Sequence, residues 1–209
     1  MRPSFDLSLY LVTDPGMVAV RGLLPTVLAA VRGGATLVQL RDKEAGEAEL
    51  GRQAEALLAA LRPLGIPLII NDRPALARAV GADGVHVGQE DGDPRRVRDL
   101  VGEAMIVGLS AGTREEFANV PEGGVVDYLG VGPVFATGTK PDHDPPIGVG
   151  GLAALVPLAP LPCVAIGGIG LGNAAAVKAT GVDGVAIVSA ICAAEDPEAA
   201  ARALRRALA

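Results

Sequence analysis

Eight short apolar segments, separated by stretches with helical spacing, constrain the fold of this 209-residue chain more than any other feature. They span residues 7–13, 35–41, 67–71, 84–88, 105–110, 128–135, 163–168 and 184–190. Each is almost continuously hydrophobic, as parallel strands buried on both faces are. No linker or shift in composition divides the chain. The pattern therefore predicts an α/β fold in which residues 1–209 form one domain, a closed (β/α)8 TIM barrel, and it favours this over a doubly wound open sheet.

Helix signals lie between these segments. Apolar residues three and four positions apart predict helices over 23–31 and 50–61. Asp93 and Asp196 are each followed by proline, which is the usual order of an N-cap residue and a first helical residue. Strands and helices thus alternate along the chain, as a barrel of strand–helix units requires.

Composition and charge narrow the class of protein. The net charge is −6 and no basic run is present, so the sequence predicts no nucleic-acid partner. No stretch of about 20 apolar residues and no signal-peptide pattern are found, so we expect a cytoplasmic protein without a membrane span. Cys163 and Cys192 lie in apolar surroundings and are expected to be free, buried thiols. The oligomeric state stays open, a homo-oligomer included.

Polar residues or glycines follow seven consecutive predicted strands, where TIM barrels carry their chemistry. The segments are 39–43, 71–73, 89–91, Ser110, 137–140, 167–168 and 188–189. Because the carboxyl ends of barrel strands meet at one rim, we expect these residues to surround one pocket.

Two carboxylates and three cations give this rim its predicted chemistry. Asp72 and Asp91 follow neighbouring strands, and paired carboxylates are the hard oxygen ligands that Mg²⁺ takes together with substrate phosphates. Taken alone, Asp72 could equally be a helix N-cap, and Asp91 would be an ordinary loop residue. Arg41, Lys43 and Lys140 would be surface charges in isolation, but beside the carboxylates they form a site for a diphosphate.

A second anion site is predicted across the same rim. The segment 137–139 and the glycines 167–168 would present hydroxyl and backbone N–H groups near the last strand, where barrels commonly bind phosphate. The residue types therefore predict a reaction between two phosphorylated small molecules. His86 is expected to pack inside the barrel and not to ligate a metal, and His143 has no predicted role. Asp42 and Glu90 are interpreted as exposed charges.

The same residues resemble a known enzyme family. The motifs in 39–43, 71–72, 86–91, 108–110, 132–140, 165–168 and 189–191 match thiamine-phosphate synthases in order and spacing, over nearly the whole chain. The resemblance implies a Mg²⁺-dependent transferase. In that reaction the nitrogen of a thiazole phosphate displaces pyrophosphate from an aminopyrimidine diphosphate, which gives thiamine phosphate.

The resemblance also implies a role for each motif residue. The pyrimidine diphosphate would be bound by Gln39, Leu40, Arg41, Asp42, Lys43, Asn71, Ser110 and Lys140. The thiazole phosphate would be bound by Thr137, Gly138, Thr139, Gly168, Val188 and Ser189. Asp72 and Asp91 would ligate Mg²⁺, and catalysis would depend on Arg41, Lys43, Lys140 and Ser110. Ala136 and Gly138 depart from the family pattern, because many members have proline at these positions.

Two alternatives remain at the level of sequence. A thiazole tautomerase on the same barrel is the nearer one, but such relatives can carry a catalytic histidine where this chain has Pro133. The other is a barrel that binds phosphate without catalysis, and the retention of Asp72, Asp91 and Lys140 argues against it. Whether the thiazole carries an additional carboxylate is not indicated by the sequence.

Overall fold

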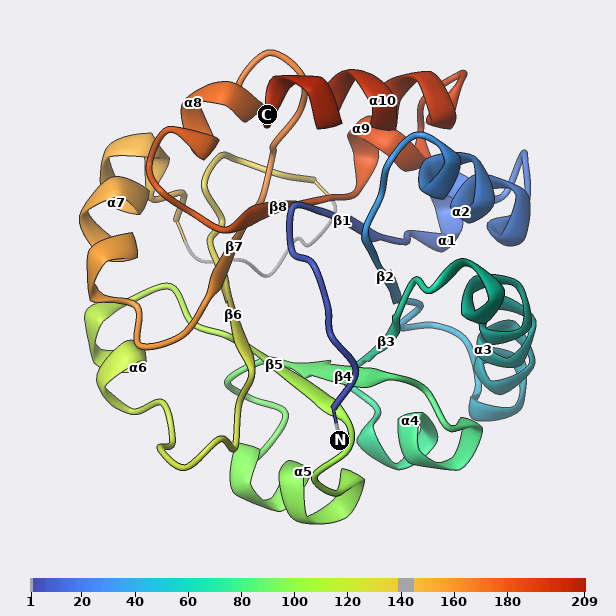
Figure 1. Ribbon diagram of the computed structural model, residues 1–209, viewed down its shortest axis with the longest axis horizontal. Helices are drawn as coiled ribbons and strands as arrows, with labels where there is room; N and C mark the ends of the chain where they lie inside the picture. The colour runs from blue at the N-terminus through green and yellow to red at the C-terminus, as the bar shows by residue number, and fades with distance from the viewer. Residues whose placement is uncertain (1, 139–144) are drawn as a thin grey trace.

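The computed structural model describes residues 2–138 and 145–209 and shows a closed barrel of parallel strands ringed by helices (Figure 1). Neighbouring strands pair in sequence order, and β8 returns to pair with β1. The strands are β1 (Leu9–Val12), β2 (Leu37–Leu40), β3 (Leu68–Asn71), β4 (Gly84–Val87), β5 (Ile106–Ser110), β6 (Tyr128–Val131), β7 (Cys163–Ile166) and β8 (Gly184–Ile187). All eight predicted strands are present, and the predicted single-domain TIM barrel is confirmed.

Helices cover the outside of the barrel. They are α1 (Pro15–Val18), α2 (Leu23–Arg32), α3 (Glu47–Leu61), α4 (Pro74–Val80), α5 (Pro94–Val101), α6 (Arg114–Ala118), α7 (Gly148–Leu155), α8 (Ala174–Lys178), α9 (Ser189–Cys192) and α10 (Pro197–Ala207). Single 3₁₀ turns, η1 (Arg62–Leu64) and η2 (Val156–Leu158), follow α3 and α7. Both predicted N-caps are confirmed: Asp93 accepts a bond from the Arg95 N–H at 2.9 Å, and Asp196 accepts one from the Ala199 N–H at 3.0 Å.

Side chains alternate between two cores along each strand, because successive residues of a strand point to opposite faces. In β1, Leu9 and Leu11 join the large core between barrel and helices, whereas Tyr10 and Val12 join the small core inside the barrel. The same alternation turns Gln39 of β2 inward. The inward positions nearest the carboxyl ends of the strands therefore decide which side chains face the rim.

Glycines make room inside the barrel. A Cβ atom on Gly108 would lie 2.2 Å from Tyr128 Cζ and 2.4 Å from His86 Nδ1, and one on Gly130 would lie 3.1 Å from His86 Cε1. Such distances are shorter than van der Waals contact, so alanine does not fit at Gly108 without displacement of its neighbours. The two glycines thus leave space for one tyrosine and one histidine inside the barrel.

The opposite end of the barrel is closed by aspartates that precede alternate strands. Asp83, Asp127 and Asp183 accept bonds from the backbone N–H groups of Leu68, Val107 and Cys163 at 2.7–2.9 Å. The guanidinium of Arg98, which is only 4% exposed, also bonds Asp127 at 2.7 Å. These contacts lie at the amino ends of the strands. In TIM barrels, residues at this end contribute to stability and not to catalysis.

Two further predictions concern the cysteines and membrane-spanning helices. Cys163 and Cys192 are free and buried, as predicted. Within residues 2–138 and 145–209, no helix combines the length and the apolar character that crossing a membrane requires.

Candidate active site

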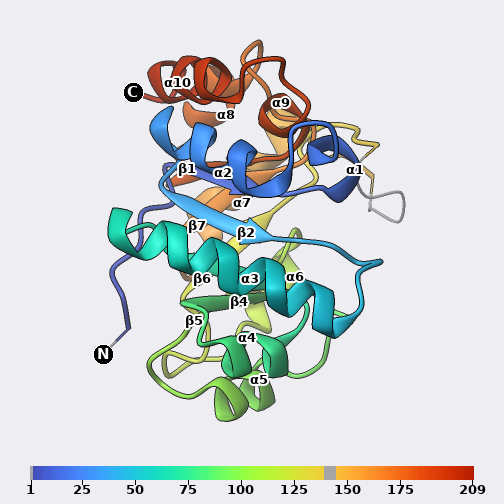
Figure 2. The same ribbon diagram turned by 90° about the vertical axis from the view of Figure 1, so that its right-hand side faces the viewer.

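The predicted site residues gather at the rim formed by the carboxyl ends of the strands. Gln39 and Leu40 end β2, Asn71 ends β3 and Ser110 ends β5. The other described members of the predicted set follow these strands and β4, β6, β7 and β8, in loops or, for Ser189, at the start of α9. All eight strands are parallel, so these loops lie on one side of the barrel, whereas the chain termini lie on the other (Figure 2).

Asp72 adopts a backbone conformation that is rare for a residue with a side chain. Its φ angle is +56°, and among the described residues it is the one non-glycine with a positive φ. Its N–H donates to the carbonyl of His86 at 2.8 Å, which continues the pairing of β3 with β4. The N-cap position of α4 belongs to Arg73, so Asp72 does not act as the helix cap that its sequence position also allowed. Strained backbone of this kind is concentrated at functional sites.

The Asp72 carboxylate faces that of Asp91. Burial raises the pKa of Asp72, and the neighbouring Asp91 raises it further, whereas Lys43 and Asn71 act in the opposite direction. The ammonium of Lys43 lies 3.6 Å from Asp72 Oδ2, and Asp91 Oδ2 accepts a bond from the Gly88 N–H at 2.7 Å. Two carboxylates held together in this way repel each other and favour a divalent cation between them.

The described residues contain no group of three or more His, Cys, Asp and Glu side chains close enough to hold a metal. This suits Mg²⁺, which commonly uses one or two carboxylates and completes its coordination with water and substrate phosphates. The donor set at this rim therefore fits a magnesium–phosphate complex.

A hydrogen-bonded chain of polar side chains crosses the barrel beneath the rim. Gln39 Nε2 donates to the Tyr10 hydroxyl at 2.7 Å, which lies 2.9 Å from the Tyr128 hydroxyl. The Tyr128 hydroxyl lies 2.9 Å from His86 Nδ1, and His86 Nε2 lies 3.0 Å from Ser110 Oγ. Two predicted pyrimidine-binding residues are thus joined through the core. His86 lies inside the barrel, as expected.

The loop after β2 places one of the predicted cations, Lys43, beside Asp72. The Arg41 N–H donates to the hydroxyl of Thr13 at 3.0 Å, which ties this loop to the end of β1. Asp42 accepts bonds from the N–H groups of Glu44 and Ala45, both at 3.0 Å, so its carboxylate stabilises the turn. Leu40 is 1% exposed and packs toward the helices, and any ligand contact at this residue would have to come from its backbone.

The described residues predicted for the second anion site follow β6, β7 and β8. A Cβ atom on Gly168 would lie 2.7 Å from the carbonyl oxygen of Ala136, so only glycine permits this close approach of two loops. Its φ angle is +63°, and its carbonyl accepts a bond from Asn173 Nδ2 at 3.0 Å. Ser189 begins α9, with Val188 at the N-cap position. Thr137 and Gly138 are within the described residues, whereas Thr139 and Lys140 lie outside them.

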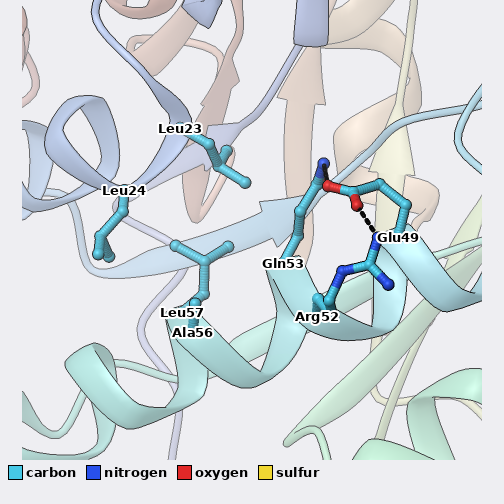
Figure 3. Close-up of a pocket in the computed structure, with 7 residues that line it drawn as sticks. All are labelled: Leu23, Leu24, Glu49, Arg52, Gln53, Ala56 and Leu57. Carbon is cyan, nitrogen blue, oxygen red and sulfur yellow. Dashed lines mark hydrogen bonds and ion pairs between the residues drawn. The ribbon is translucent and has the colours of Figure 1, made fainter.

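The larger of two pockets does not coincide with the predicted site. A pocket of about 250 Å³ lies outside the barrel between α2 and α3, where a Glu49–Arg52 ion pair borders an apolar floor (Figure 3). None of the predicted site residues lines it. A smaller pocket of about 100 Å³ at the end of β2 includes Leu40, Arg41 and Asp42. The paired carboxylates and the polar chain mark the site more clearly than either cavity does.

Comparison with known proteins identifies the family. A family model described as thiamine monophosphate synthase matches residues 9–191 of the chain. The chain belongs to the thiamine-phosphate synthase family. It is therefore an enzyme, a transferase of thiamine biosynthesis.

Individual relatives of the family match over most of their length. A thiamine-phosphate synthase from Xanthobacter autotrophicus is 57% identical over 208 residues, which cover 100% of this chain and 98% of that protein. One from Azorhizobium caulinodans is 54% identical over 201 residues, or 96% of this chain and 94% of that protein. The solved structure of thiamine phosphate pyrophosphorylase from Pyrococcus furiosus has a TM-score of 0.86 at 36% identity, covering 97% of this chain and 95% of that chain. The family resemblance inferred from the strand-end motifs is confirmed.

Sequence reasoning missed two residues that lie inside the barrel beneath the rim of the synthase. Tyr10 and Tyr128 were counted only as members of apolar strands, yet their hydroxyls join Gln39 to His86. A signal was available, since these are the only two tyrosines of the chain. In the period-2 alternation of β1 and β6, both occupy inward positions.

Proposed function

We propose that this chain joins an aminopyrimidine diphosphate to a thiazole phosphate, with release of pyrophosphate and formation of thiamine phosphate. The observation that carries the proposal is the pair of facing carboxylates, Asp72 and Asp91, beside Lys43 of the β2 loop. Such a site suits a diphosphate that leaves, because fixed positive charge stabilises the negative charge that develops on it.

Mg²⁺ is the proposed cofactor, held by Asp72 and Asp91 together with phosphate oxygens and water. When bound, it would neutralise charge on the leaving pyrophosphate. Burial and, after it, the nearby Asp91 raise the pKa of Asp72, and the close approach of the two carboxylates supports this assignment. Lys43 lies on the Asp72 side of the pair and would extend the positive field toward the terminal phosphate.

The proposed pyrimidine diphosphate site extends from the polar chain to the loop after β2. Gln39, Asn71 and Ser110 would bind the pyrimidine substrate, and Asn71 also bonds Asp72. The diphosphate would be bound by Arg41, Lys43 and Lys140, the last of which is outside the described residues. Backbone groups of Leu40 and Asp42 would complete this site.

The proposed thiazole phosphate site lies across the rim. Thr137, Gly138 and Thr139 would contact the thiazole moiety, while Gly168, Val188 and Ser189 would bind its phosphate. The close packing of Gly168 on the β6 loop supports a site that is rigid before the substrate arrives. Rigid placement of the nucleophile next to the leaving group accelerates a displacement by reducing the entropy cost of the encounter.

The cellular context is proposed on the same basis. The partners are phosphorylated small molecules, without nucleic acid or membrane, and the location is the cytoplasm. The net charge of −6 and the anion-binding rim support the assignment of partners. Residues 1–209 are proposed to act as one domain, as the unbroken alternation of strands and helices supports, and a homo-oligomer is compatible with this.

Incubation of the protein with both substrates and Mg²⁺ tests the proposed function, with thiamine phosphate detected by mass spectrometry. The protein should form the product, and Asp91→Asn should form little. Asp99→Asn removes an exposed carboxylate from α5, away from the rim, and should behave as the parent protein. Failure of the parent protein to form thiamine phosphate from these substrates would contradict the proposal.

A further inference from the structure

The two tyrosines in the barrel hold a chain of hydrogen bonds whose direction can be worked out. Tyr10 is 1% exposed, Tyr128 is 0% exposed and Gln39 is 4% exposed, so water cannot substitute freely for these partners. Burial, as the largest cause, raises the pKa of both phenols well above 10. Both hydroxyl protons therefore stay in place at neutral pH, and each hydroxyl donates one bond.

The amide of Gln39 sets the direction of the chain. Its Nε2 group can only donate, so the Tyr10 oxygen accepts at this contact. If Tyr10 then donates to Tyr128, the Tyr128 proton is directed to His86 Nδ1. In the reverse direction, Tyr10 would accept from both neighbours, and its own buried proton would have no acceptor in the chain. An unsatisfied buried donor is costly, so the first direction is favoured.

The direction of the hydrogen bonds fixes which nitrogen of His86 carries the proton and how the Ser110 hydroxyl is oriented. Since Nδ1 of His86 accepts a bond, its Nε2 carries the proton and donates to Ser110 Oγ. Ser110 is the last residue of β5, and its own proton is then left to point toward the rim. At the other end, the carbonyl Oε1 of Gln39 is left to accept a bond from a ligand.

We propose that Tyr10 and Tyr128 are positioning residues that make Gln39 an acceptor and Ser110 a donor toward the substrate. A ligand that fits must offer a hydrogen-bond donor to Gln39 and an acceptor to Ser110, as an amino group beside a ring nitrogen does. This deepens the proposed function, on which it rests, by explaining how the site would select an aminopyrimidine. A hydroxypyrimidine, whose ring presents N–H and carbonyl groups, would set its carbonyl against Oε1 of Gln39, and its N–H would offer no acceptor for the Ser110 proton.

The backbone is shaped to admit this chain. Alanine at Gly108 would place a Cβ atom 2.4 Å from both the Tyr128 hydroxyl and His86 Nδ1. These two atoms form the hydrogen bond between Tyr128 and His86. Gly130 leaves similar room beside the imidazole of His86. Polar side chains inside a barrel core are expensive unless every group is paired. Glycines on two adjacent strands therefore make room for a buried polar chain that is costly to form, and such a cost suits a functional role.

Nuclear magnetic resonance of ¹⁵N-labelled histidine tests the direction without any need for activity. The chain has two histidines, and a His143→Gln variant assigns the signals of His86. At neutral pH, His86 should be neutral with its proton on Nε2. A proton on Nδ1 would mean that the Gln39 amide is turned and every bond reversed, which would overturn the proposal, as would a doubly protonated ring.

Two phenylalanine variants then separate positioning from packing. Tyr128→Phe should release His86 into a mixture of tautomers and raise KM for the pyrimidine diphosphate roughly tenfold, or about 1.4 kcal/mol. Tyr10→Phe should also raise this KM, but it should leave the tautomer unchanged because Tyr128 still donates to His86. KM for the thiazole phosphate should change by less than about twofold in both variants, since uniform binding at the other site is untouched.

Thr26→Val is the matched control, because it removes a buried hydroxyl that bonds Gly22 in α2 and has no link to the rim. It should leave both KM values and the tautomer as in the parent protein. Equal effects of Thr26→Val and Tyr128→Phe on the pyrimidine KM would overturn the positioning role. If the protein made no thiamine phosphate at all, the proposed function would fail while the tautomer measurement still decided the direction of the chain.

Discussion

Replacement of Gly108 by alanine should destabilise the protein strongly, although it adds a single methyl group. The added Cβ atom would lie 2.2 Å from Cζ and 2.4 Å from the hydroxyl of Tyr128. The Tyr128 ring cannot easily yield, because Phe5, Tyr10 and His86 surround it with ring centroids 5.4–6.0 Å away. Relief of the contact requires a shift of more than about 1 Å in a close-packed core.

The cost can be bounded from this geometry. Overpacking of a core by a methyl group costs about 1–3 kcal/mol, and a rigid buried ring places Gly108→Ala near the upper end, at about 3 kcal/mol. In a protein of this size, that corresponds to a decrease in Tm of about 6–12 °C. The substitution should also break the bond between Tyr128 and His86, so that activity falls in the folded fraction as well.

Urea denaturation followed by circular dichroism measures this change, and Gly51→Ala is the opposite control. Gly51 lies inside α3, where a Cβ atom would be 3.7 Å from Leu76, an ordinary contact. Alanine in a helix interior should therefore stabilise the protein by about 0.5–1 kcal/mol. If Gly108→Ala were as stable as the parent protein, the barrel interior would not be packed as described and the reasoning would be refuted.

The remaining predictions concern charge and reactivity. Asp72→Ala or Asp91→Ala should abolish most turnover with little change in Tm, and full activity of the parent protein in excess chelator would refute the metal site. The folded-state pKa of Asp72 is raised above 3.8. Protonated Asp72 therefore stabilises the folded protein below pH 3.8, and this stabilisation is lost as pH rises through the folded pKa. Protons should therefore compete with Mg²⁺, whose affinity by calorimetry should fall as pH falls through the same range. Burial raises the pKa of Cys163 and Cys192 to about 11, so iodoacetamide at pH 8 should label them only after unfolding, and rapid labelling of the native protein would contradict their burial. Lys140→Ala should lower kcat by roughly 10² if it acts on the leaving group, and an effect on thiazole KM alone would assign it to the other site.

The pattern of the sequence predicts the strands and the rim because both depend on local periodicity. Gln39 and Ser110 could be placed at the rim since each ends a continuous apolar segment. The left-handed backbone of Asp72 could not be predicted, because its local context fits a helix N-cap and only the pairing with His86 imposes the turn.

Long-range contacts account for the rest of what the sequence did not reveal. Tyr10 and Tyr128 are 118 positions apart, and apolar strands give no indication that two hydroxyls meet. The raised pKa of Asp72 likewise depends on burial and on a carboxylate from another loop. Proximity of Asp72 and Asp91 could be inferred from adjacent strands, but the electrostatic consequence required the fold.

The contact of α10 with α2 has a consequence for synthesis of the protein. Gly33, which follows α2, packs so closely on α10 that a Cβ atom there would lie 2.4 Å from the Glu198 carbonyl oxygen, and Arg32 Nε bonds Glu198 at 2.8 Å. The surface of α2 is therefore covered by a helix that leaves the ribosome about 166 residues later. β1 likewise has one open edge until β8 emerges. In a nascent chain this edge of β1 and the surface of α2 stay uncovered until β8 and α10 emerge, which is the interval in which chaperones would bind them.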